Sequence, residues 1–177
     1  MNLLRHVTFE SFIFSIISLV LVLLFSGRVE AVTNWSVDKR FKDNGDKTIT
    51  DTKTGLMWMK EDSYLHSGHW VNWFESIQFV KKMNEDGFAD QYDWQIPSVD
   101  QLTTLYEADK INSKVLGRGM NIHIDSIFSK EGGASLWSIE ENGYHNAFGV
   151  IFNTGKRFNS SKKSRFRKSF RAVRYSN

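Results

Sequence analysis

The sequence predicts an α+β domain with antiparallel strands, two helices and a long irregular middle. Short strand-like segments, bounded by Gly, Asn and Asp, occur in residues 40–59 and again in residues 135–175. Two segments with the spacing of amphipathic helices lie between them, in residues 70–87 and 98–105. A length of 177 residues, with 41% hydrophobic and 24% charged residues, suits one globular domain of ordinary size. The absence of cysteine excludes disulfides, thiolate chemistry and cysteine-based zinc sites.

The N-terminus has a composition of its own. Arg5 and His6 precede an apolar run over residues 12–25, which fits the core of a secretory signal and is short for a membrane span. Val29 and Ala31 supply a small-residue cleavage pattern, so we predict a signal peptide over residues 1–31 and a single domain over residues 32–177. The alternative is an uncleaved N-terminal anchor that keeps the domain near a membrane. In either case we expect export, to the periplasm, the cell surface or the medium.

Residues 40–59 are interpreted as three short strands joined by two tight turns. The first strand ends at Phe41, the second covers residues 48–50 and the third covers residues 56–59. The second turn contains Gly55, at a position that needs left-handed backbone geometry. The first turn consists of Asp43, Asn44, Gly45 and Asp46.

A calcium loop is the competing interpretation of the first turn, because it is rich in carboxylates. An EF-hand loop carries Gly at its sixth position and a bidentate Glu at its twelfth. Here Gly45 is the third residue, and the twelfth residue counted from Asp43 is Thr54. We therefore predict a turn, and we expect neither a metal nor a cofactor.

Two helices are predicted in the middle of the chain. The first has an apolar face and a stop at Gly87. Ser98 begins the second, with Gln101 completing a capping box, and Val99, Leu102 and Leu105 facing inward. The apolar face of the first helix is expected to consist of Trp70, Trp73, Phe74, Ile77, Val80 and Met83.

The last third is predicted to return to strands after an irregular stretch over residues 109–133. Strands are expected at residues 135–140, 146–158 and 169–175. The turn signal Asn153-Thr154-Gly155 can fold the middle one into a hairpin. In the last strand, Arg171 and Arg174 are expected to have structural carboxylate partners.

Charge divides the mature chain sharply. Residues 156–174 hold nine Lys or Arg and no acid, whereas residues 32–155 hold 12 basic and 18 acidic residues. A basic segment attracts anions, and the arginine fork matches sulfate, phosphate and carboxylate groups. The alternative is a solvent-exposed loop whose positive charge only offsets the negative charge of residues 32–155. We predict an anion-binding set made of Lys156, Arg157, Lys162, Lys163, Arg165, Phe166, Arg167 and Lys168.

Other candidate sites are weaker. His123 and Asp125 have strand spacing and could act as a base and its orienter, which makes an uncharacterised hydrolase the enzymatic alternative. Glu140 and Glu141 are adjacent on a strand, so their side chains should point to opposite faces and not converge. His66 and His69 are interpreted as loop residues that precede the first helix.

Several blocks occur in a recognisable order: "RFKDNGDKTITDTKTGLMWMK", "DWQIPSVDQLTTL", "LWSIEE", "GVIFNTGK" and "FRAVRY". This order resembles the Lcl C-terminal domain family, named after the C-terminal domain of a bacterial collagen-like adhesin. The resemblance covers about residues 35–175. It implies a C-type-lectin-like fold and surface or periplasmic binding, with glycan adhesion in the namesake and no general catalytic activity. Within these blocks we expect the core to include Trp58, Trp94, Pro97 and Trp137.

The sequence departs from the family pattern at three places. Gln95 stands where the family usually has Arg, and Lys47 stands where it usually has Gly. The first helix lacks the cysteine that many members carry, which excludes the cysteine-dependent oxygenase chemistry of related enzymes.

The function predicted from the sequence is an exported, non-enzymatic binding or adhesion module. Its expected partners are anionic polysaccharide, lipopolysaccharide or anionic lipid headgroups. Nucleic acid is not expected, because export argues against it and no nucleic-acid motif is present. A structural, homo-oligomeric subunit of the cell envelope is the non-enzymatic alternative.

Overall fold

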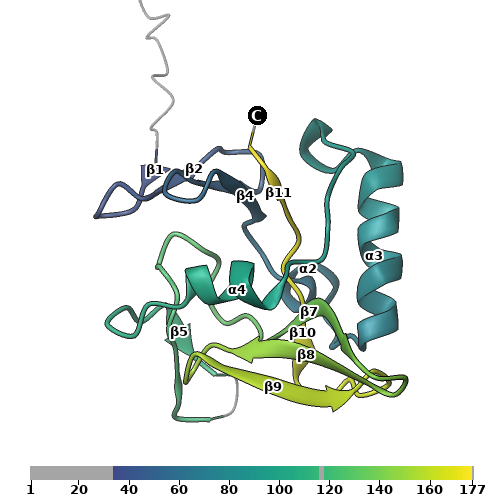
Figure 1. Cartoon of the computed structure of the whole chain (residues 1–177). Helices are drawn as coiled ribbons and strands as arrows, with labels where there is room; N and C mark the ends of the chain where they lie inside the picture. Colours follow the sequence, from purple (N-terminus) through teal and green to yellow (C-terminus); the bar gives the residue numbers. More distant parts are fainter. Residues whose placement is uncertain (1–33, 116–117, 177) are drawn as a thin grey trace, which may run out of the picture. The chain divides into compact units, whose positions relative to one another are not determined.

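Short strands in three sheets make up much of the computed structural model, which describes residues 34–115 and 118–176. The predicted leader, residues 1–31, lies outside the described residues. Figure 1 shows a five-stranded sheet on one side of helix α4 and a four-stranded sheet on the other. The sheets are mostly antiparallel and the helices few, so the α+β class is confirmed.

The five-stranded sheet joins the beginning and the end of the described chain. Its order is β1-β2-β3-β4-β11, and every neighbouring pair is antiparallel. The predicted strand over residues 56–59 is confirmed with the same bounds. The strands are β1 (Asn34–Trp35), β2 (Phe41–Asp43), β3 (Thr48–Asp51), β4 (Leu56–Met59) and β11 (Val173–Tyr175).

The four-stranded sheet has the order β10-β7-β8-β9. β8 (Asn146–Ile151) and β9 (Lys156–Ser161) form the predicted hairpin, and Gly155 in its turn has φ 70°. β7 (Ser135–Asn142) pairs with β8 in antiparallel fashion and with β10 (Lys168–Ser169) in parallel. A third sheet holds only β5 (Ser113–Lys114) and β6 (Asn121–Ile122).

The single strand predicted over residues 169–175 is wrong. Its first residues belong to β10 in one sheet and its last residues to β11 in the other. Residues 170–172 connect the two strands, and the side chains of buried Phe170 and Ala172 pack in the core. The alternation of apolar residues carried no sign of this change of sheet.

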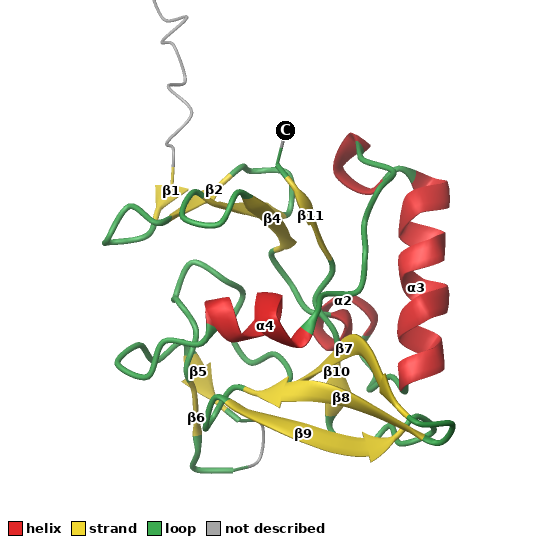
Figure 2. Ribbon diagram, in the orientation of Figure 1, coloured by secondary structure: helices red, strands yellow, loops and turns green. Residues whose placement is uncertain are grey.

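Three α-helices and one short 3₁₀ helix complete the described part of the fold (Figure 2). α3 (Trp73–Asp86) is capped by Asn72 and Glu75 at its start and by Gly87, φ 66°, at its end. α4 (Val99–Leu105) has the predicted Ser98–Gln101 capping box. α2 (Ser63–Ser67) and the 3₁₀ helix η1 (Phe88–Asp90) were not predicted. In residues 34–115 and 118–176 no helix has the length and apolarity needed to cross a membrane.

The predicted apolar face of the first helix needs two corrections. The capping box of Asn72 begins α3 after Trp70, and the Trp70 ring stacks on Tyr64 at 3.8 Å between centroids. Phe74 is 45% exposed, and its ring meets that of buried Trp73 edge-on at 5.5 Å between centroids. His66 belongs to α2 and not to a loop.

The carboxylates of the first turn bind backbone and side-chain donors. Asp43 Oδ1 accepts from the Gly45 N–H at 3.0 Å, and its Oδ2 lies 2.5 Å from Lys60 Nζ. Asp46 Oδ1 accepts from the Thr48 N–H at 3.0 Å. These contacts are those of a turn, and Gly45 has the positive φ of 80° that such a turn uses. Gly55 likewise has the predicted left-handed geometry, with φ 70°.

The core consists of two apolar clusters. One lies around α4, whose Leu102 and Leu105 pack with residues of both large sheets. The other lies between α3 and β7 and contains Trp94 and Trp137. The prediction of a core role is confirmed for all four motif residues: Trp58, Trp94, Pro97 and Trp137 are buried.

Candidate functional site

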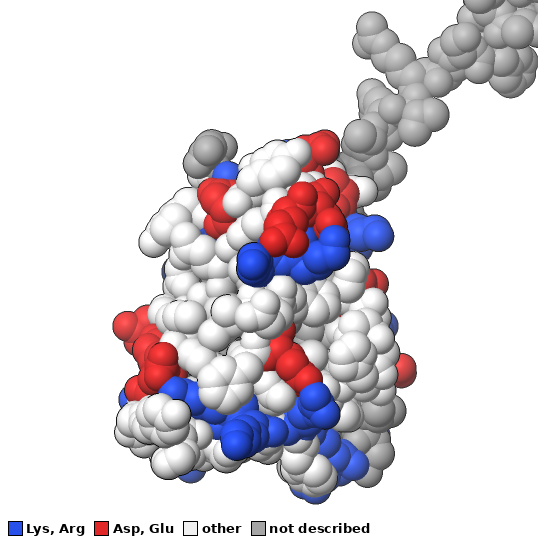
Figure 3. Space-filling view, turned by 90° about the vertical axis from the view of Figure 1, so that its right-hand side faces the viewer, with Lys and Arg blue, Asp and Glu red and all other residues white. Residues whose placement is uncertain are grey.

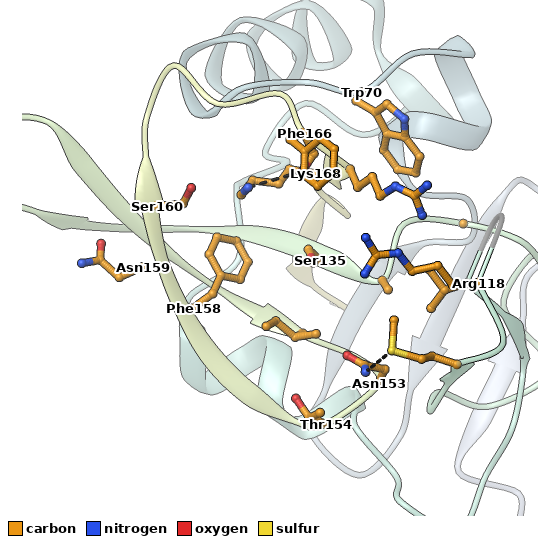
Figure 4. Close-up of a pocket in the computed structure, with 16 residues that line it drawn as sticks. Trp70, Arg118, Ser135, Asn153, Thr154, Phe158, Asn159, Ser160, Phe166 and Lys168 are labelled. Atoms are coloured by element: carbon orange, nitrogen blue, oxygen red, sulfur yellow. Dashed lines mark hydrogen bonds between the residues drawn. The ribbon is translucent and has the colours of Figure 1, made fainter.

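A pocket of about 480 Å³ opens beside the exposed side of the β8–β9 hairpin (Figure 4). Its residues come from β9, from the end of the loop that leads into β10, and from the segment around Arg118. This volume is typical of sites for small ligands. The pocket brings together parts of the chain that lie up to about a hundred positions apart.

Aromatic rings form much of the wall. Trp70, Phe158 and Phe166 line the pocket, and Phe166 is 71% exposed. Phe158 lies opposite Gly149 across the β8–β9 pair, where only a residue without a side chain leaves room for the ring. Flat apolar faces beside polar groups are the surfaces on which sugar rings and other amphipathic ligands stack.

Three cationic side chains line the same pocket: Arg118, Arg167 and Lys168. Figure 4 shows the Arg118 guanidinium directed inward, toward Ser135. The other polar residues of the wall are neutral, and among the described residues no Asp or Glu lines it. Burial lowers the pKa of the Lys168 ammonium below its ordinary value. The guanidinium groups of Arg118 and Arg167 nevertheless suit the pocket to an anion.

The structure brings three of the eight predicted anion-binding residues into this pocket, namely Phe166, Arg167 and Lys168. Lys162 is buried instead, where its Nζ contacts Glu141 and lies 4.9 Å from the Trp73 ring centroid. The guanidinium of Arg165 pairs with Glu75, with Nε 2.9 Å from Oε2. These two residues are engaged within the fold and do not line the pocket.

The remaining three predicted residues lie on the surface. Lys156, Arg157 and Lys163 are exposed, and the Arg157 guanidinium lies 4.3 Å from the Phe148 ring centroid. Figure 3 shows that Lys and Arg side chains gather in a band across the lower part of one face, next to Asp and Glu. The charge of the basic segment is thus partly compensated at the surface.

Sequence reasoning missed several residues of the pocket. Phe158 and Ser160 alternate along β9, so the hairpin prediction could have placed them on one face. Trp70 was assigned to a helix face. Arg118 carried no local signal, because it lies in the stretch interpreted as irregular.

The model of one family, the Lcl C-terminal domain, matches residues 47–174. The chain belongs to the Lcl C-terminal domain family. The resemblance seen in the sequence is therefore confirmed. The match covers β3, β4, the whole four-stranded sheet, α3, α4 and every residue of the pocket. No curated protein matches this sequence.

This Lcl C-terminal domain contains a cluster of three carboxylates: Asp38, Glu107 and Asp125. In the described residues it is the one group of three or more potential ligands spaced to hold a metal ion. Lys110 Nζ lies 2.6, 2.5 and 2.7 Å from their oxygens, respectively. A cation from the chain itself thus already balances the cluster.

His123 and Asp125, the two residues of the predicted hydrolase alternative, both contact Lys110. His123 Nδ1 lies 2.9 Å from the Lys110 carbonyl oxygen, and Asp125 pairs with the Lys110 ammonium. Asp125 Oδ1 also accepts from the Ile127 N–H at 2.9 Å. This arrangement gives each of the two residues a structural partner.

The two adjacent glutamates diverge, as the strand geometry predicted. Both oxygens of Glu140 accept from the Val99 N–H at the start of α4, at 2.9 and 3.1 Å. Glu141 contacts Lys162. The pair therefore cannot share one substrate.

Two arginines near the C-terminus are structural. Arg174 Nε donates to Asp93 at 2.6 Å, so the prediction of a carboxylate partner is confirmed for Arg174. For Arg171 it needs correction, since its guanidinium donates to the Met59 carbonyl at 2.7 Å and to the Lys60 carbonyl. Burial lowers the pKa of Arg171 to about 10, against the opposing effect of nearby Asp62.

A second pocket, of about 590 Å³, lies against α3. Apolar side chains such as Val71, Phe79 and Met83 line it, together with His66 and His69. The His66 ring meets Phe79 edge-on at 5.5 Å, and His69 Nδ1 lies 3.1 Å from the Ser67 carbonyl oxygen. The two histidines therefore have separate partners.

Proposed function

We propose that this domain is an exported, non-enzymatic binding module that recognises an anionic glycan or another anionic component of the cell envelope. The pocket beside β9 is the centre of the proposed site. Export through the predicted leader and a C-type-lectin-like arrangement of the two large sheets are parts of the same proposal, and the glycan adhesion of the family's namesake supports it.

One observation carries the proposal. The pocket wall combines two guanidinium groups, a lysine amine, three aromatic rings and neutral hydrogen-bonding groups, and none of its described residues is a carboxylate. An acidic sugar needs this combination, because its ring packs on an aromatic face while its sulfate or carboxylate binds a guanidinium. The predicted basic segment contributes one side of the pocket and Arg118 contributes the other.

The residues of the basic segment differ in how directly their removal would test ligand binding. Lys162 and Arg165 have internal carboxylate partners, so their removal tests the fold as well as binding. Arg118 and Phe166 are exposed and line the pocket, which makes them the sharper probes.

The test is retention of the full chain on a heparin column and binding to an array of acidic and neutral glycans. We expect retention to fall with salt, since screening weakens exposed charge pairs. Arg118→Ala should weaken binding roughly ten- to a hundredfold, as expected for a lost hydrogen bond to a charged group. Phe166→Ala should weaken it through the lost stacking face.

The matched control is Lys81→Ala, which removes one positive charge from an exposed position of α3, outside the pocket. Its retention should stay close to that of the unchanged chain. Equal losses in Arg118→Ala and Lys81→Ala would show that net charge alone drives retention, and the pocket would then be rejected as the site.

A further inference from the structure

Lys168 occupies an unusual position for a lysine. Its Nζ lies 5.5 Å from the ring centroids of both Trp137 and Phe158. Its hydrogen-bond partners are neutral oxygens at long distances, Ser164 Oγ at 3.3 Å and the Phe166 carbonyl at 3.4 Å. Among the residues that the structure describes, no Asp or Glu forms an ion pair with it.

Other enclosed lysines of this domain contrast with Lys168. Lys162 also lies over a tryptophan ring, yet Glu141 balances its charge. Lys110 has three carboxylate partners and Lys60 has Asp43. The ammonium of Lys168 is partly withdrawn from water and lacks this compensation.

One physical effect favours the neutral amine at this position. Burial penalises the charged form, and the pKa of Lys168 is lowered for that reason. A lysine that is desolvated or placed beside other cations is the type that attacks carbonyl groups.

The pocket also supplies the means of selecting a substrate. Arg118 is directed into it and can hold a carboxylate, and Ser135 lies beside the guanidinium (Figure 4). In the same figure Lys168 lies near Phe166 and Phe158, so the amine and the anion-binding group belong to one cavity.

We propose that Lys168 is a nucleophilic amine that captures small carbonyl compounds with an anionic group, such as 2-oxo acids, as an imine within this pocket. The neutral amine attacks the carbonyl carbon and gives a carbinolamine. Loss of water, made of the carbonyl oxygen and two protons from the nitrogen, leaves the C=N bond. The step is a condensation, so it needs no oxidant or reductant and is reversed by water. It is stoichiometric and does not depend on glycan binding.

The test uses the full chain, pyruvate as the anionic carbonyl and propanal as the neutral one. Borohydride fixes any imine as a secondary amine, and peptide mass spectrometry locates and quantifies it. Lys156 and Lys163 are the internal references, because both are exposed and belong to the same basic segment.

With pyruvate we expect clearly more adduct on Lys168 than on either reference, because its lowered pKa leaves a larger share of neutral amine and Arg118 can hold the carboxylate beside it. Arg118→Gln should remove the preference for pyruvate over propanal and leave labelling by propanal in place, which also shows that the variant is folded around an accessible amine. Labelling of Lys168 that is no greater than that of Lys156 and Lys163 with both probes would overturn the proposal.

Discussion

Gly149 of β8 lies directly opposite Phe158 of β9, and the phenyl ring covers the bare backbone of the glycine. A Cβ at position 149 would overlap that ring and the carbonyl oxygen of Leu136. The glycine therefore decides where an aromatic wall of the pocket lies. It also couples the stability of the four-stranded sheet to the shape of the site.

Gly149→Ala is expected to destabilise the domain by about 1–3 kcal/mol, the usual cost of an added group in a close-packed region. Part of the strain should be relieved by displacement of Phe158, so ligand retention should fall as well. Urea unfolding gives the free energy of unfolding. Gly119→Ala is the matched control, because nothing lies within 4 Å of a Cβ there and its backbone needs no positive φ. If the two variants unfold alike, the close approach at Gly149 has no energetic role.

Lys110→Met is expected to lower the free energy of unfolding by about 2–4 kcal/mol. The change leaves the carboxylates of Asp38 and Asp125 without their cation, and Asp125 is buried, whereas Glu107 keeps its ion pair with Arg40. Adding Asp125→Asn to this variant should recover part of the loss, because one of the repelling charges is gone. The control is Lys81→Met, an exposed helix lysine whose ion pair is worth less than about 0.5 kcal/mol. A loss for Lys110→Met within that small range would contradict the role given to the cluster.

The ion pair between Glu75 and Arg165 predicts a dependence of stability on pH. Arg165 holds the pKa of the Glu75 carboxyl below its ordinary value of 4.5. A lowered pKa in the folded state means that the stabilisation is present above pH 4.5 and is lost as the pH falls through the folded value. Arg165→Ala should therefore lower the free energy of unfolding slightly near neutral pH and leave it almost unchanged in strong acid.

Chemical denaturation of both proteins over a pH series measures this difference. Lys163→Ala is its control, since it removes an exposed charge from the same loop and breaks no ion pair among the described residues. The interpretation fails if the cost of Arg165→Ala is the same at every pH.

Features set by neighbouring residues could be predicted from the sequence. Ser98 and Gln101 are three positions apart, and their capping box follows from helix geometry alone. The same is true of Gly55 and of the turn at Asn153-Thr154-Gly155, where the backbone requirement lies within four residues.

Features set by distant contacts could not be predicted. Residues 168–175 change from one sheet to the other because each half pairs with a strand more than thirty positions away. Lys162 is buried because Glu141 and Trp73 meet it, and neither is near it in sequence. Arg118 reaches the pocket from a stretch without a pattern. The sequence therefore predicted one basic side of the pocket. Tertiary contacts determine which of the basic side chains in that segment line the pocket.

Lys47 provides the last prediction, because it has φ 73° in the turn after Asp46 and stands where the family usually has Gly. A side chain in left-handed geometry costs roughly 1–2 kcal/mol, and glycine avoids that cost while losing some entropy in folding. Lys47→Gly should therefore raise the free energy of unfolding by about 0.5–1 kcal/mol. The backbone carbonyl of residue 47, which accepts from the Lys60 N–H at 2.8 Å, is kept. Lys42→Gly in the neighbouring strand β2 should have the opposite effect, since glycine weakens a strand with ordinary geometry. Urea unfolding of the two variants gives both signs, and a loss of stability in Lys47→Gly would show that the lysine side chain stabilises the turn by more than its backbone strain.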